Sequence, residues 1–263
     1  TSSTNFPVSS GCKQSSNAGN VDGFIIKFSD TGQRKWATYF GGTQNDNIYG
    51  VDVDQNYNIY FGGSTGSNNA SIVSAGVWKP SRTSTDIEGW LGKFDSTGVF
   101  SWASFFGGTN TDVIMGVSYN KKLNKLNYCG YTQSNTSTVS TSKDKIYSTV
   151  SITGKKDFRG GASDAFVGQF SNAGALGWSR YSGDTAEDLF NSIETDTGGN
   201  IYCYGTTFSR ANITTKIAHQ KTYGGSGDAY LAKYKNAGDS VWISYVGGSF
   251  KDVGWDLTID TFG

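Results

Sequence analysis

Residues 22–46 read DGFIIKFSDTGQRKWATYFGGTQND, and the 263-residue chain contains three further segments of equal length with the same plan. Each segment opens on an acidic residue, has a glycine ten positions later and a tryptophan four positions after that, and closes on an aspartate a further ten positions on. The opening acids are Asp22, Glu88, Asp164 and Asp228; the glycines Gly32, Gly98, Gly174 and Gly238; the tryptophans Trp36, Trp102, Trp178 and Trp242; the closing aspartates Asp46, Asp112, Asp188 and Asp252. A unit of fixed length that recurs in this way predicts a repeat architecture.

The composition favours an all-β protein. The chain has 36 Gly, 16 Phe, 15 Tyr and 7 Trp but only 2 Pro, which is typical of many short strands joined by glycine turns. The net charge of zero argues against nucleic-acid binding, and no apolar stretch reaches the roughly 18 residues that membrane insertion requires.

Each repeat contains four predicted strands. Residues 24–28 alternate large and small side chains as a strand does, and the turn at 29–32 ends on a glycine suited to a tight hairpin. Residues 36–39 form a second strand with aromatics on both faces, so we expect the tryptophans to pack between neighbouring sheets; sugar stacking is the alternative. Strands at 49–53 and 58–61 follow. Four antiparallel strands per repeat predict the blades of a β-propeller, since the rungs of a linear β-solenoid do not return as hairpins.

Segments such as residues 223–234 (YGGSGDAYLAKY) and 5–7 (NFP) resemble the SBBP family of β-propeller repeats. The resemblance extends over essentially the whole chain and implies blades arranged around a channel, in secreted or surface-anchored microbial proteins. It transfers no catalytic residues to this sequence.

The usual order of strands in a propeller places the 49–53 type innermost and the tryptophan strand outermost. On that order residues 1–47 hold the outer two strands of one blade, residues 48–108, 113–184 and 189–248 three blades, and residues 249–263 the inner strand of another. We therefore expect a segment of a propeller of six to eight blades, whose remaining blades are its first partners, rather than a four-bladed ring.

The repeats differ in length mainly between the second and third strands of each blade, at residues 63–88, 130–164 and 205–228. Variable loops on a rigid scaffold are where binding sites usually arise, although such loops also simply fill the rim. These connections, counted with Lys13, carry a net charge of +8, which suits an acidic polysaccharide or an anionic cell surface. The candidate binding residues here are Trp78, Lys155, Lys156, Arg159 and Arg210.

The closing aspartates Asp46, Asp112, Asp188 and Asp252 are expected to converge near the channel mouth on the same face. A ring of carboxylates can hold Ca²⁺ or serve a carbohydrate-active enzyme. The sequence favours a structural role over these two alternatives: each aspartate then accepts backbone hydrogen bonds and fastens one blade to the next.

The sequence contains few residues or motifs that would support any other kind of catalysis. The single histidine, His219, lies in one of the connections, and no nucleophile elbow, phosphate loop or Cys-x-x-Cys occurs. Cys129 and Cys203 are expected to be small buried hydrophobes that face opposite sides of their strands. The sequence thus favours a non-enzymatic, extracellular or cell-surface scaffold that contacts a protein or a glycan without a cofactor. A Ca²⁺-dependent lectin or glycosidase and a purely architectural spacer remain the alternatives.

Overall fold

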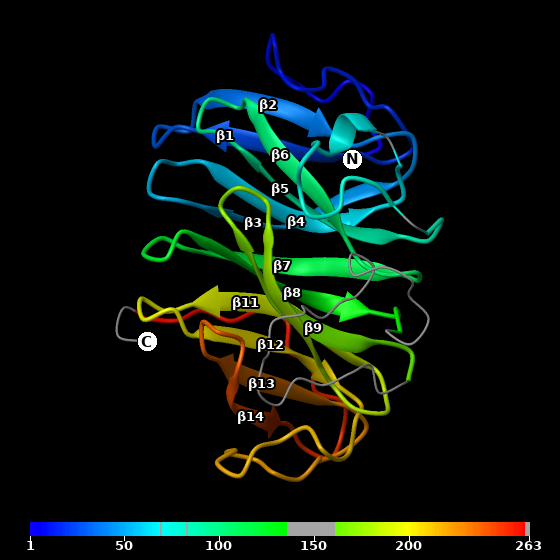
Figure 1. The fold of residues 1–263 in the computed structure, drawn as a ribbon, viewed down its shortest axis with the longest axis vertical. Helices are drawn as coiled ribbons and strands as arrows, with labels where there is room; N and C mark the ends of the chain where they lie inside the picture. The colour runs from blue at the N-terminus through cyan, green and yellow to red at the C-terminus, as the bar shows by residue number, and fades with distance from the viewer. Residues whose placement is uncertain (69, 83, 136–160, 261–263) are drawn as a thin grey trace.

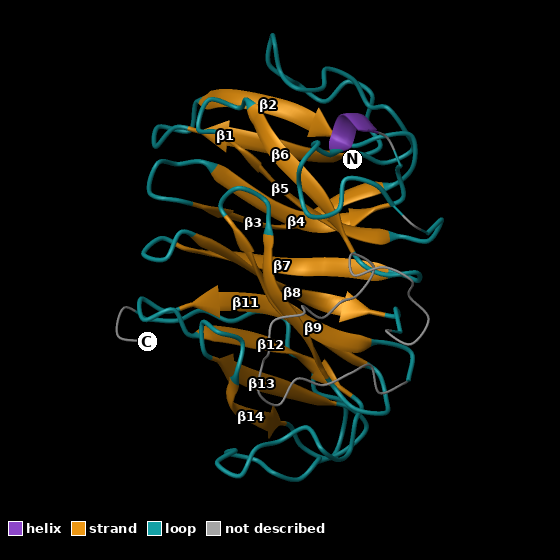
Figure 2. Ribbon diagram, in the orientation of Figure 1, coloured by secondary structure: helices purple, strands orange, loops and turns teal. Residues whose placement is uncertain are grey.

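The computed structural model describes residues 1–68, 70–82, 84–135 and 161–260, and it is all-β apart from one 3₁₀ turn at Ala70–Ile72 (Figure 2). Its sheets are antiparallel. We name the four sheets in chain order the half blade, blade A, blade B and blade C. The half blade has β1 (Gly23–Phe28) and β2 (Arg34–Phe40). Blade A has β3 (Asp46–Val53), β4 (Ile59–Thr65), β5 (Glu88–Phe94) and β6 (Phe100–Phe106). Blade B has β7 (Asp112–Asn120), β8 (Lys125–Thr132), β9 (Asp164–Ser171) and β10 (Leu176–Ser182), and blade C has β11 (Asp188–Thr195), β12 (Ile201–Thr207), β13 (Asp228–Tyr234) and β14 (Ser240–Val246).

The blades follow one another along the long axis of the molecule (Figure 1). The first strands of the blades, β3, β7 and β11, contact one another in that order and so form the inner side, while β6, β10 and β14 are the outer strands. The predicted fold class is confirmed: the chain is built of four-stranded antiparallel propeller blades. Among the described strands, β1 pairs only with β2, so the half blade keeps a free edge.

Residues 249–263 were expected to form an inner strand, and within the described residues 252–260 no strand forms. The segment nevertheless lies beside β11, since Asn191 Nδ2 donates to the Gly254 carbonyl at 2.6 Å and the Leu257 amide donates to Ser192 Oγ at 3.3 Å. The segment lies where an inner strand was expected. It is not a strand, because no described strand pairs with residues 252–260 through the backbone hydrogen bonds of a sheet.

Three of the four repeated tryptophans fasten their own blade to the next one. The indole Nε1 of Trp102 on β6 donates to the Asn172 carbonyl in the β9–β10 turn of blade B, at 2.9 Å. A methyl group added at Gly174, which has φ +82°, would lie 2.9 Å from that indole. The repeated glycine is thus needed for the turn and for the close approach of the preceding blade's tryptophan. Trp36 and Trp178 donate in the same way to the carbonyls of Ser96 and Asn236.

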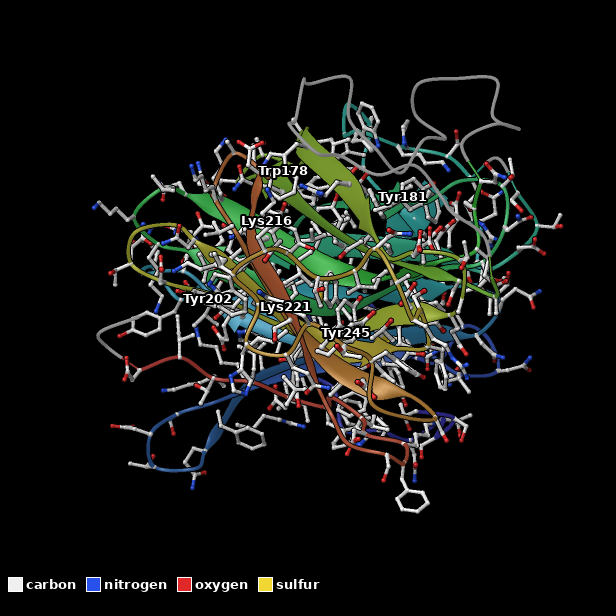
Figure 3. All side chains as sticks on the ribbon, turned by 90° about the horizontal axis from the view of Figure 1, so that it is seen from below. Trp178, Tyr181, Tyr202, Lys216, Lys221 and Tyr245 are labelled. Atoms are coloured by element: carbon white, nitrogen blue, oxygen red, sulfur yellow. The ribbon has the colours of Figure 1, made fainter. Side chains whose placement is uncertain are left out.

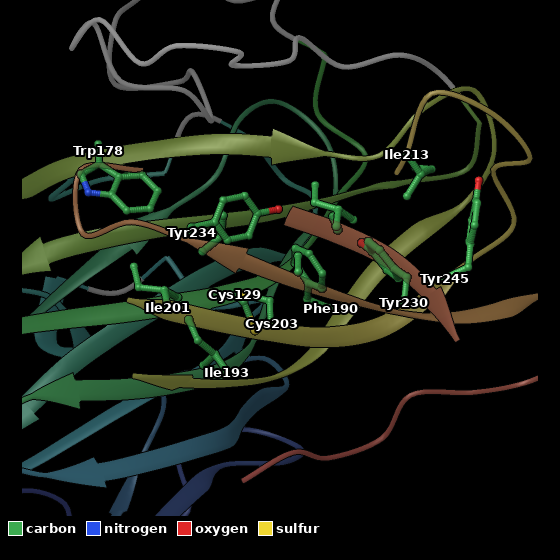
Figure 4. Packing of buried hydrophobic residues seen from close by; sticks show 14 residues of the cluster. Cys129, Trp178, Phe190, Ile193, Ile201, Cys203, Ile213, Tyr230, Tyr234 and Tyr245 are labelled. Carbon is green, nitrogen blue, oxygen red and sulfur yellow. The ribbon is translucent and has the colours of Figure 1, made fainter. Parts of the chain in front are cut away.

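The blade interfaces are filled by aromatic and aliphatic side chains. Between blades B and C this core includes Cys129 and Cys203, which are fully buried and meet across the interface (Figure 4). Burial, and then contact with Cys129, raises the pKa of the Cys203 thiol well above its usual value. Both thiols therefore serve as small buried apolar groups.

Candidate functional site: the face of the long connections

The long connections leave the blades at one end, together with the glycine-rich loops that join consecutive blades. The Gly66 amide, which follows β4, donates to the Asn45 carbonyl in the loop before β3 at 2.8 Å. The Phe208 amide, which follows β12, donates to the Glu187 carbonyl before β11 at 2.9 Å. We call this end the loop face; the tight hairpins lie at the opposite end (Figure 1).

Part of each described connection runs along the outermost strand of its blade. In blade A the Ser74 amide donates to the Ala103 carbonyl, and the Phe105 amide on β6 donates back to the Lys79 carbonyl. Blade C repeats this contact: the Thr215 amide donates to the Ile243 carbonyl, and the Tyr245 amide donates to the Gln220 carbonyl. These segments cover strand edges that would otherwise invite association.

The repeated aspartates at the start of each inner strand are buried and saturated with hydrogen bonds. Asp46 is 0 % exposed, and its Oδ2 accepts from the Gly42 amide at 2.7 Å and from Ser67 Oγ at 2.8 Å. Its Oδ1 accepts from Thr65 Oγ1. Asp112 accepts from the Gly108 amide, Thr132 and Ser134, and Asp188 from the Asp184 amide, Thr207 and Ser209. Asp252 is half-buried and accepts from the Gly248 amide at 2.8 Å.

This geometry supports the structural role of the aspartates and contradicts the alternative of a carboxylate ring open at the channel mouth. Asp46, Asp112 and Asp188 are 0 % exposed, and none of them lines a cavity found among the described residues. Ca²⁺ needs several free oxygen ligands, whereas these oxygens face N–H and O–H donors. In the described part of the chain, no group of three His, Cys, Asp or Glu side chains is arranged to hold a metal. The aspartates fasten the loop between two blades to the end of the second strand.

The hydroxyl partners of these aspartates were missed in the sequence. Each second strand ends in Thr-x-Ser, at Thr65–Ser67, Thr132–Ser134 and Thr207–Ser209. Its recurrence 19 or 20 residues after each aspartate is the signal that would have found it. Because serine and threonine are common throughout this chain, composition masked the pattern.

Burial makes Asp112 sensitive to pH. It raises the pKa of this carboxyl to about 7, although hydrogen bonds from Thr132, the Gly108 amide and Ser134 oppose the shift. The folded state therefore holds a proton that the unfolded chain releases near pH 4, and the resulting stabilisation is lost as pH rises through about 7. We expect the free energy of unfolding to fall by a few kcal/mol between about pH 4 and about pH 8, since each pKa unit corresponds to about 1.4 kcal/mol.

The variant Asp112→Asn tests this prediction by urea unfolding across that pH range. We expect Asp112→Asn to be less stable than the wild type at low pH but to show a flatter dependence on pH. An unchanged slope in the variant would assign the pH dependence to other groups.

Two of the basic residues counted toward a positive rim are buried instead. Lys79 is 1 % and Arg82 9 % exposed, and the Lys79 ammonium forms an ion pair with the buried Glu88 and donates to the Gly107 carbonyl at 2.9 Å. Gln14 and Gln220 occupy the place of Lys79 in other repeats and donate to Asp22 and Asp228. The connection of blade A therefore presents neither of these charges to solvent.

The other candidate binding residues differ in where they lie and in how exposed they are. Trp78 is half-buried against the core between blades A and B, and its amide donates to the Gly174 carbonyl at 3.2 Å, so it is no free platform. Lys155, Lys156 and Arg159 lie outside the described residues. Arg210 is exposed on the connection of blade C, and its guanidinium carbon lies 5.7 Å from the ring centroid of Tyr223.

The connection of blade C, residues 208–227, combines positive charge with exposure. Arg210, Lys216 and Lys221 are all exposed, and no acidic residue occurs between residues 206 and 227. Figure 3 shows Lys216 and Lys221 on this connection. Beside Arg210 and Tyr223 lies an open cavity of about 340 Å³. This connection thus presents three exposed basic side chains and no acidic one, and its residues 215–220 run along β14.

The comparison with known families agrees with the architecture. The family model SBBP, described as a beta-propeller repeat, matches residues 35–69, which cover most of β2 and all of β3 and β4. The predicted resemblance is confirmed in this repeat, and the chain contains an SBBP β-propeller repeat. No curated protein matches the chain. In the described residues, no helix is long and apolar enough to cross a membrane.

Proposed function

We propose that the chain is a non-enzymatic β-propeller scaffold that acts outside the cell or at its surface and binds an acidic polysaccharide through its loop face. The observation that carries this proposal is the connection 208–227, with three exposed basic side chains and no acidic one. The electrostatic attraction between a polyanion and such a surface is screened by salt over a distance of roughly 10 Å.

A scaffold role rather than catalysis is supported by how the acidic residues are used. The repeated aspartates that a glycosidase would need are engaged in fastening blades to each other. His219 is exposed on the connection 208–227, and no described hydrogen bond joins it to a serine or carboxylate. The family resemblance to secreted propellers supports the extracellular location.

Binding of the protein to immobilised polygalacturonate at low salt tests the proposal. The combined variant Arg210→Ser, Lys216→Ser, Lys221→Ser is expected to lose binding by about tenfold or more, because it removes the basic surface. The matched control is Lys121→Ser, Lys122→Ser, Lys235→Ser, which removes equal charge from exposed hairpins at the opposite end. Equal losses in both variants would show that only the overall charge matters and would refute a site on the loop face.

A purely architectural role is the second candidate, favoured by one observation. The segments 74–79 and 215–220 lie along outer strands, and part of each covers the exposed edge of its blade. In this case neither the wild type nor the variants would bind the polyanion.

A further inference from the structure

Trp255 combines an exposed side chain with a firmly held backbone. It is 73 % exposed, more than any other tryptophan in the described chain. On either side of it, Gly254 is held by Asn191 and by Thr206 Oγ1, and the Leu257 amide donates to Ser192. A methyl group on Gly254 would lie 2.4 Å from the Gly205 carbonyl oxygen, so the segment is seated closely on β12. An indole on such an anchored backbone is a pre-organised binding surface.

Trp255 occupies the repeat position at which the other three repeats have a β-bulge, although its own segment forms no strand. The pairing of each inner strand with its neighbour shifts register at Tyr49, Met115 and Asn191, which are bulge residues. Each lies three positions after its repeated aspartate, as Trp255 does after Asp252. β-bulges re-aim side chains, often beside functional sites. The backbone position is constant while the side chain differs in every repeat, which is the pattern of a binding position on a fixed scaffold.

A cavity of about 460 Å³ lies at this position, where the inner side meets the loop face. This volume falls within the range of about 300–1,000 Å³ for small-molecule sites. Its lining combines aromatic rings with amide, carboxylate and phenol groups, and includes Trp255, Tyr131, Phe208, Gln133, Glu187 and Asn191.

The charges around the cavity balance one another. Glu187 contributes one carboxylate, and Lys251 contributes one ammonium group, whose Nζ lies 5.4 Å from the ring centroid of Phe208. This balance favours an uncharged ligand. A pyranose fits the chemistry: its C–H face stacks on an indole, and its hydroxyls exchange hydrogen bonds with amide and carboxylate groups.

We propose that this cavity binds an uncharged pyranose residue of a glycan, with Trp255 as the stacking surface and Gln133 and Glu187 as hydrogen-bonding partners. The inference deepens the proposed function and rests on it for the ligand class, but it uses none of the three basic residues of the connection 208–227.

Titration with cellotriose, chitotriose and maltotriose at high salt tests the site, read by tryptophan fluorescence and by saturation-transfer NMR. At least one trisaccharide is expected to bind and to shift the emission of the exposed indole. Trp255→Ala should weaken that binding by about tenfold or more, while Glu187→Gln weakens it less. The matched control Phe250→Ala removes a nearby aromatic side chain that is 81 % exposed and does not line the cavity, so its binding should equal that of the wild type.

Absence of binding by all three trisaccharides, or equal affinity of Trp255→Ala and the wild type, overturns the proposal. The thermal unfolding curve of Trp255→Ala should match that of the wild type, because an exposed indole contributes little to folding. Neutral sugars at high salt do not depend on the basic surface. Failure here therefore leaves the polygalacturonate result standing, and failure of that test leaves this one standing.

Discussion

Replacing Trp102 by alanine is expected to lower the free energy of unfolding by about 3–5 kcal/mol, the range for truncating a buried tryptophan. The indole is 7 % exposed, packs beside Gly174 and Phe170 of blade B, and donates to the Asn172 carbonyl. The substitution therefore opens a cavity between two blades and leaves a carbonyl without its donor. Urea unfolding followed by circular dichroism measures the loss.

The same residue in blade C provides the control. Trp242 is half-buried, and among the described residues no following blade covers it. Trp242→Ala should therefore cost clearly less than Trp102→Ala. Equal losses would mean that the tryptophans act within their own blades, which would contradict the interlocking of neighbouring blades.

Replacing Glu88 by glutamine is expected to destabilise the protein by about 3–5 kcal/mol, although the two side chains have nearly the same shape. The change removes the carboxylate that offsets the buried charge of Lys79, and breaking a buried ion pair from one side costs about this much. Arg82, whose Nε lies 3.9 Å from the same carboxylate, adds to the loss. The measurement is again the free energy of unfolding in urea.

The other repeats indicate how to restore this stability. Gln14–Asp22 and Gln220–Asp228 occupy the same place without a lysine. The double variant Lys79→Gln, Glu88→Asp should recover most of the stability lost in Glu88→Gln, since it installs the pairing that those repeats use. A double variant as unstable as the single one would show that the sites are not equivalent.

The sequence was sufficient to predict the blades because their strands are specified locally. Alternation at residues 24–28 and the glycine turn at 29–32 are visible within a few residues, and they reappear as β1, β2 and the hairpin between them. The contact between Trp102 and the Asn172 carbonyl could not be predicted in the same way. Its partners are 70 residues apart and meet only through the stacking of blades.

The candidate site was predicted less well, because charge and residue type do not reveal burial. Lys79 and Arg82 were counted as rim charges, since lysine and arginine are usually solvated. Their burial depends on Glu88, and the equivalence of Gln14, Lys79 and Gln220 was the available signal. Residues 249–263 were predicted to form an inner strand, whereas the segment around Trp255 lies beside β11 without forming one. The exposure of Trp255 depends on how Gly254 is held by Asn191 and Thr206, which residue types alone do not specify.

Binding to polygalacturonate in the presence and absence of a chelator, at low and at high salt, is the decisive measurement. It shows whether the loop face binds an acidic polysaccharide while the repeated aspartates hold the blades together. We expect binding that high salt abolishes and that the chelator leaves unchanged. Binding that the chelator abolishes and that salt leaves unchanged would contradict it, because the carboxylates of Asp46, Asp112 and Asp188 would then hold a metal at a ligand site.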